Sequence, residues 1–77
     1  MRAYVLIEAE AGAGPSVLTD VRSLPECIQA DRVTGPYDVI CVLESNDLDR
    51  IGDLVNTTVH GIRGVRRTMS CLRFEIH

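Results

Sequence analysis

A hairpin in the middle of the chain sets its topology, and it reads Val33-Thr34-Gly35-Pro36-Tyr37-Asp38-Val39-Ile40-Cys41-Val42-Leu43-Glu44. Glycine followed by proline is typical of a tight turn, and the apolar, β-branched residues from Tyr37 to Glu44 predict a strand. Residues 27–33 before the turn alternate in part between apolar and polar, as exposed edge strands do. Because the connection is so short, the two strands should be antiparallel neighbours.

A strand and a helix are predicted on the N-terminal side of the hairpin. Residues 3–10 are apolar at their centre and end at a glycine-rich stretch, which predicts a strand. A helix should start near Pro15, which suits a first helical turn, and should end before Pro25. Its apolar stripe at helical spacing consists of Val17, Leu18, Val21 and Leu24.

A second helix and a last strand are predicted on the C-terminal side. Residues 45–47 supply side chains that can cap the start of a helix, and Gly61 is the expected C-cap. The expected buried face of this helix consists of Leu48, Ile51, Gly52, Val55 and Val59. Residues 65–76 then alternate again, which predicts a long strand at a sheet edge.

The predicted order of elements is therefore βαββαβ. With right-handed crossovers in both halves, this order gives a ferredoxin-like α+β fold, a four-stranded antiparallel sheet with two helices on one face. These crossovers place the first and third strands in the centre of the sheet, and the two strands are also the most apolar. We expect one domain over residues 1–77.

The two central strands also predict self-association. Residues 5–7 and 39–43 are apolar at odd and even positions alike, although a sheet with one face in water should alternate. With both helices on one face, a second copy of the sheet is the simplest cover for the other face, which predicts a homodimer packed sheet to sheet, a dimeric α/β barrel. The alternative is a sheet with an unusually apolar open face.

Composition excludes several classes of protein. The 77 residues carry a net charge of -3, and the longest apolar stretches, residues 3–7 and 39–43, fall far below the roughly 20 residues that span a bilayer. The N-terminus lacks the pattern of a secretion signal, so we expect a cytoplasmic protein without membrane contact. The acidic balance and the absence of a basic run argue against direct DNA binding.

Metal and cofactor chemistry is not expected. Cys27, Cys41 and Cys71 are odd in number and widely separated, which disfavours a disulfide or zinc framework. We expect all three to be half-buried small apolar residues. No nucleophile with a neighbouring base and no HExxH, GxSxG, phosphate-loop or dinucleotide motif appears, so an enzyme is not predicted.

Two groups of polar residues are candidates for ligand binding. The Gly35-Pro36 turn presents Tyr37 and Asp38 at the end of a central strand, where a phenol and a carboxylate can meet the ammonium group of a small zwitterion. The alternative is that Asp38 only binds the backbone of the turn. Thr68 and Ser70 share one face of the last strand and can receive a carboxylate or amide, or they serve only in cross-strand pairing.

A resemblance gives these candidates a context. Residues 3–7, 24–25, 33–38, 47–48 and 64–70 together resemble the effector domain of the Lrp/AsnC family of feast/famine transcription regulators, the RAM domain. The resemblance implies the βαββαβ fold, dimers formed through the sheets, rings of dimers such as an octamer, and a small-molecule amino acid bound between dimers. It also implies which residues contact the ligand, namely Gly35, Pro36, Tyr37, Asp38, Thr68 and Ser70. Ser70 stands where many relatives have threonine, so the identity of the amino acid stays open.

The chain departs from full-length regulators at its start. Its first strand begins within a few residues of Met1, so we expect a stand-alone effector domain without the helix-turn-helix domain. Such a domain would sense an amino acid, form mixed assemblies with full-length Lrp/AsnC regulators, or do both. Two alternatives share the fold: a small dimeric α/β-barrel enzyme of the monooxygenase type, and an ACT-like regulatory module with its ligand near the first strand and helix.

Overall fold

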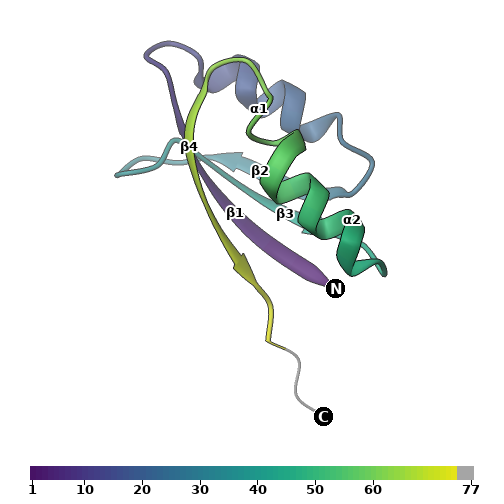
Figure 1. The fold of residues 1–77 in the computed structure, drawn as a ribbon. Coiled ribbons are helices and arrows are strands. Elements are labelled where there is room, and N and C mark those ends of the chain that lie inside the picture. Colours follow the sequence, from purple (N-terminus) through teal and green to yellow (C-terminus); the bar gives the residue numbers. More distant parts are fainter. Residues whose placement is uncertain (75–77) are drawn as a thin grey trace.

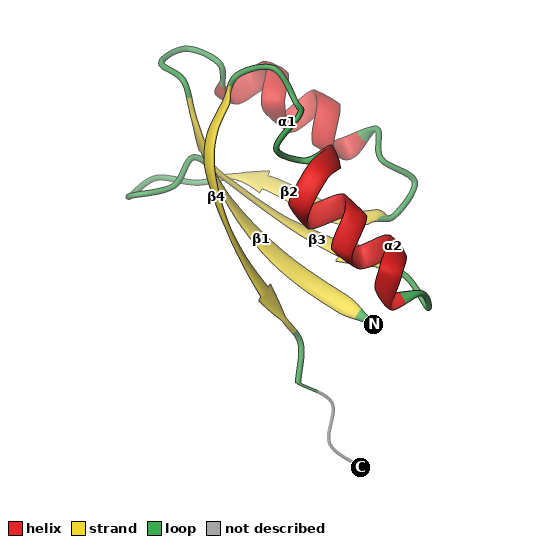
Figure 2. Cartoon of the chain, viewed as in Figure 1, coloured by secondary structure: helices red, strands yellow, loops and turns green. Residues whose placement is uncertain are grey.

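The computed structural model, which describes residues 1–74, has its strands and helices in the predicted order (Figure 1). The elements are β1 (Arg2–Ala9), α1 (Gly14–Arg22), β2 (Cys27–Arg32), β3 (Val39–Glu44), α2 (Leu48–Asp53) with a continuing π-helical segment η1 (Leu54–Thr58), and β4 (Val65–Leu72). The strands form one antiparallel sheet in the order β2-β3-β1-β4. Both helices lie on the same side of the sheet (Figure 2). The ferredoxin-like fold and the central positions of β1 and β3 are thus confirmed.

The central strands bury one face completely. Side chains on the helix side of β1 and β3 are fully buried, namely Ala3, Val5, Ile7, Val39, Cys41 and Leu43. Their neighbours in the sequence point to the other side of the sheet, which we call the open face, and are only half-buried, namely Tyr4, Leu6, Ile40 and Val42. The hairpin between β2 and β3 turns at Gly35, whose φ of +126° is a conformation that favours glycine.

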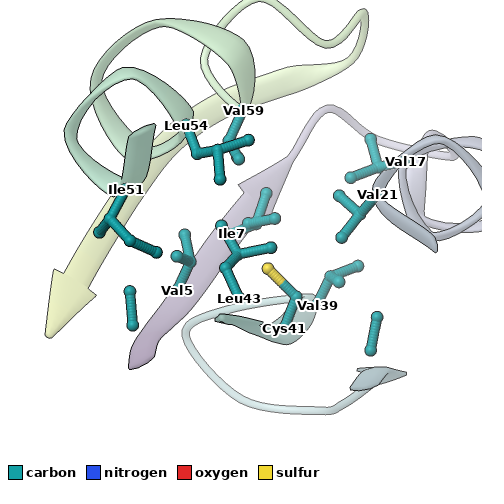
Figure 3. Close-up of a cluster of buried hydrophobic side chains, with 12 residues drawn as sticks. Val5, Ile7, Val17, Val21, Val39, Cys41, Leu43, Ile51, Leu54 and Val59 are labelled. Carbon is teal, nitrogen blue, oxygen red and sulfur yellow. The ribbon is translucent and has the colours of Figure 1, made fainter. Parts of the chain in front are cut away.

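The core lies between the sheet and the helices (Figure 3). Val17 and Val21 enter it from α1, as the helical spacing predicts. The Cys41 side chain lies in the middle of this cluster, and burial raises the pKa of its thiol to about 12. Cys41 is therefore a neutral, apolar core residue. The prediction of half-burial is confirmed for Cys27 and wrong for Cys41, which is fully buried, and for Cys71, which is exposed on β4.

The buried face of the second helix differs in part from the predicted one. Its fully buried residues are Ile51, Leu54 and Val59, while Leu48 is 56% exposed. Ile51 and Val59 belong to the predicted face and Leu54 does not, while Gly52 and Val55 are only half-buried. A π-helical hydrogen bond from the Val59 amide to the Leu54 carbonyl lets these two residues, five positions apart, share the buried side. The Asp47 side chain caps the helix by accepting a hydrogen bond from the Asp49 amide at 2.9 Å.

Two further predictions about the C-terminal part are corrected. Gly61 does not adopt a left-handed conformation and is no C-cap of that kind, whereas Gly64, just before β4, has a φ of +96°. The last strand ends at Leu72 and not at residue 76. Phe74 is 83% exposed beyond the strand, and residues 75–77 lie outside the described part.

Both edges of the sheet are exposed strands, as predicted. On the β2 edge the Arg22 guanidinium of α1 donates two hydrogen bonds to the Ala30 carbonyl, at 2.8 and 3.2 Å. Because this carbonyl is already hydrogen-bonded, another strand is less able to pair with it, which protects the edge from association with a further strand. Within residues 1–74, neither helix combines the length and the apolar character needed to cross a bilayer.

Candidate ligand-binding site

Asp38 is anchored by hydrogen bonds at the end of the central strands. Its amide donates to the Ile7 carbonyl at 2.8 Å, and its carbonyl accepts from the Val33 amide at 2.9 Å. Its carboxylate Oδ2 accepts from the Ala9 amide at 2.7 Å in a partly buried bond. One carboxylate oxygen therefore holds the end of β1, as the backbone-binding alternative expects, and Oδ1 has no hydrogen-bond partner within the described residues.

The residues that enter the turn border an open surface hollow. Gly35 and Pro36 are exposed, and a surface depression of about 540 Å³ beside them is lined by Arg32, Val33 and Thr34. The Tyr37 side chain is half-buried, and its hydroxyl lies 3.9 Å from the Met69 Sδ of β4, a weak acceptor. Because Met69 pairs with Leu6, this contact lies on the open face.

Thr68 and Ser70 lie on the opposite side of the sheet, the side that carries the helices. Thr68 pairs with Ile7 and Ser70 with Val5, two residues that are fully buried under the helices. Nevertheless Thr68 is only half-buried and Ser70 is exposed, and Leu72 on the same side of β4 is 54% exposed. The helices thus cover the central strands and leave the helix side of β4 accessible.

A histidine joins these hydroxyls, which the sequence did not indicate. His60 lies just after η1, and its Nε2 is 2.8 Å from the Thr68 Oγ1. Histidine at the end of a helix is commonly a surface residue, and only the π-helical turn places this one against β4. No spacing rule for regular helices points to this contact.

One chain does not bring the two predicted groups together. Asp38 is bonded to Ile7, and Thr68 pairs with Ile7 from the other side, so two strand spacings, or about 10 Å, separate them. The ammonium and carboxylate of an amino acid are attached to the same carbon atom and cannot bridge this distance. A single copy of the chain therefore does not place both groups around one amino acid.

Polar pairs surround the apolar part of the open face. Arg2 and Glu44 form an ion pair at 2.8 Å at one end, Glu8 and Arg67 form one at 3.2 Å at the other, and the Gln29 amide donates to Asp31 at 2.9 Å on β2. The hydrogen bond from Arg2, and then its charge, lower the pKa of Glu44. The enclosed apolar residues are Tyr4, Leu6, Ile40, Val42 and Met69.

Metal binding finds no support in residues 1–74, where no group of three or more His, Cys, Asp or Glu side chains could hold an ion. The candidate groups are instead hydroxyls, a carboxylate, a phenol and an imidazole. These groups bind polar organic ligands by hydrogen bonds.

Comparison with known proteins identifies the type of domain. The family model of the Lrp/AsnC ligand-binding domain matches residues 2–77. A curated relative, the HTH-type transcriptional regulator FL11 of Pyrococcus furiosus, is 24% identical over 97% of this chain, and the chain spans about half (49%) of that protein's length.

Solved structures agree with this match. The crystal structure of TTHA0845 from Thermus thermophilus is 28% identical, with a TM-score of 0.89 over 99% of this chain and 95% of that one. The transcriptional regulator NMB0573 of Neisseria meningitidis, solved as a complex with L-Met, shares the fold at 20% identity and a TM-score of 0.81, over 96% of this chain and 49% of that one. Since the family model covers nearly all of the sequence, the chain belongs to the family of Lrp/AsnC ligand-binding domains.

Proposed function

We propose that this domain senses a free amino acid, which binds between copies of the chain. The observation that carries the proposal is the accessible pair of hydroxyls, Thr68 and Ser70, on the helix side of β4. The turn from Gly35 to Asp38 of another copy supplies the second half of the site, with the free Asp38 oxygen for the ammonium group. The L-Met complex of the Neisseria regulator supports this class of ligand.

A homodimer formed through the open face is the first step of this assembly. Its apolar centre, surrounded by three polar pairs, has the pattern of a protein–protein interface with a polar rim. A small domain also needs this burial, since a chain of this size draws little net stability from its own core. Dimers then associate into rings such as an octamer, which brings the turn of one dimer beside β4 of the next.

Amino-acid binding is testable by calorimetry with each of the twenty protein amino acids, L-methionine first. One of them should bind at or below millimolar concentration, and Thr68→Ala should weaken it about 5- to 100-fold because a buried ligand carboxylate loses a hydrogen-bond donor. Thr19→Ala is the matched control, since the Thr19 hydroxyl on α1 bonds only the Pro15 carbonyl. The assigned site is wrong if no amino acid binds, or if Thr68→Ala and Thr19→Ala bind equally well.

The domain acts on transcription indirectly, through mixed assemblies with full-length Lrp/AsnC regulators. With a net charge of -3, the chain alone should bind duplex DNA only weakly, with a dissociation constant of about 10⁻⁴ M or more at ~0.15 M salt. Fluorescence anisotropy measures this. Tight binding of the purified chain to one promoter sequence would contradict the indirect role.

A further inference from the structure

We propose that His60 is a positioning residue of the amino-acid site, and that protonation of its ring fixes the direction of its hydrogen bond with Thr68, so that the Thr68 hydroxyl donates to the ligand carboxylate. The inference rests on the proposed function, since it takes Thr68 as a ligand contact. It adds a residue and a pH dependence to that function.

His60 directly follows the end of the π-helical segment, and its ring lies against β4. The bond from the Val59 amide to the Leu54 carbonyl, at 2.9 Å, inserts one residue into the turn compared with an α-helix. The Gly61 amide then donates to the Thr57 carbonyl at 2.9 Å, so His60 lies inside a hydrogen-bonded turn. Its backbone is held while its ring reaches the Thr68 Oγ1 at 2.8 Å. Such π-helical turns are rare and are frequent at functional sites.

The hydrogen bond between the two side chains has two possible directions. A threonine hydroxyl carries one donor hydrogen and two acceptor lone pairs. When the His60 Nε2 carries no proton, the Thr68 hydroxyl donates to it, and only lone pairs remain for a ligand. When Nε2 carries a proton, in one neutral tautomer or in the imidazolium, it donates to Oγ1, and the Thr68 hydrogen is free to bind a carboxylate.

Protonation of the ring makes the second direction obligatory. The imidazolium form has donors at both nitrogens, so Nε2 can only donate. Its positive charge next to Thr68 also favours an anionic ligand group. The affinity for an amino acid carboxylate should therefore rise as the pH is lowered and the imidazolium form becomes populated.

Other charged groups near His60 do not reproduce this dependence. The arginines nearby keep their charge over the whole range. Glu8 is paired with Arg67 on the open face, away from Thr68. The charged residues that follow His60 in the sequence, or lie on or next to β1 and β4 near Thr68, are Arg63, Arg66, Arg67, Glu8 and Glu10.

Calorimetry at pH 5.5, 6.5 and 8.0 tests the inference with the amino acid that binds most tightly to the unmodified protein. Between pH 8.0 and 5.5 its affinity should rise about fivefold, the effect of one added hydrogen bond. In His60→Gln the amide group does not titrate, so the affinity should be independent of pH. His77→Gln is the matched control, since it removes the only other histidine of the chain and should keep the full pH dependence.

Thr68→Val provides a second readout that a merely structural role of His60 would not move. It removes the hydroxyl and keeps the side-chain shape, so the ¹⁵N signals of the His60 ring should shift in the ligand-free protein. An affinity that changes equally with pH in His60→Gln and in the unmodified protein overturns the inference, and so does an affinity independent of pH in both. In those cases the proposed function survives, whereas the absence of any amino-acid binding overturns both.

Discussion

Gly64 shows how one residue joins the two halves of the fold. It has a φ of +96°, and a Cβ added there would lie 2.8 Å from the Ala13 Cβ and 3.3 Å from the Val17 Cγ2 of α1. Its carbonyl also accepts a hydrogen bond from the Glu10 amide at 2.7 Å. The turn before β4 therefore lies directly on the start of α1, and only glycine fits there.

Gly64→Ala should lower the free energy of unfolding by about 2 kcal/mol or more, through the unfavourable φ together with the steric contact. Gly52→Ala is the matched control, because a Cβ at Gly52 in α2 meets nothing within 4 Å and alanine favours a helix. That control should be neutral or stabilising by up to about 1 kcal/mol. Urea unfolding measures both, and equal stabilities would refute the role of Gly64.

Asp38 has a structural role that is separable from its proposed ligand role. Asp38→Ala leaves the partly buried Ala9 amide without its acceptor and should cost about 1–3 kcal/mol of stability. Asp38→Asn keeps an acceptor oxygen and should cost less, while it weakens amino-acid binding by removing the negative charge. Thermal unfolding and calorimetry together distinguish the two roles, and equal stability of both variants would contradict the Ala9 bond.

At the scale of elements, the second helix is attached to the other half of the domain by an ion pair. The Arg50 guanidinium of α2 donates to both carboxylate oxygens of Glu26, before β2, at 2.7 and 3.2 Å. These hydrogen bonds, more than any other cause, lower the pKa of Glu26 in the folded state. The same bonds raise the pKa of Arg50, which stays charged at any working pH.

This pair makes stability depend on pH in acid. Because the folded pKa of Glu26 is lower than its unfolded value of about 4.3–4.5, the contribution of the pair is present above that value and is lost as the pH falls through the folded pKa. The difference in stability between the unmodified protein and Glu26→Gln should therefore be larger at pH 6 than at pH 3. Urea unfolding at low salt measures it, with the exposed Glu10→Gln as the control. A difference that does not depend on pH would rule out this role.

At the scale of the whole molecule, the two faces of the sheet predict opposite results for neighbouring substitutions. Val39 is fully buried on the helix side of β3, so Val39→Asp places an unpaired carboxylate in the core and should unfold the chain. Val42 lies on the open face of the same strand, so Val42→Asp should leave the core of each copy intact and dissociate the dimer into monomers of reduced stability. Circular dichroism measures folding, and light scattering measures mass. A monodisperse 8.5 kDa species for the unmodified protein would exclude the dimer.

The sequence alone was enough for the topology. The change of hydrophobic period along the chain, Pro25 and the Gly35-Pro36 turn predict βαββαβ with β1 and β3 in the centre, because period and turn chemistry are local properties that neighbouring residues encode. The polar groups at Asp38, Thr68 and Ser70 were also visible, since residue type and strand alternation select them. Whether they bind an amino acid stays a prediction.

Only the tertiary structure determined the features that depend on contacts between distant segments of the chain. Local spacing predicted Leu48 on the buried face of α2 and missed Leu54, yet Leu48 is exposed, and Leu54 and Val59 are both buried across a π-helical turn. The same turn brings His60 to Thr68, and the bond to Ala9 engages one oxygen of Asp38. Local sequence patterns do not predict these contacts, because each contact depends on the position of an element that is distant in the sequence. The free energy of tertiary packing also exceeds the small conformational preferences of individual residues.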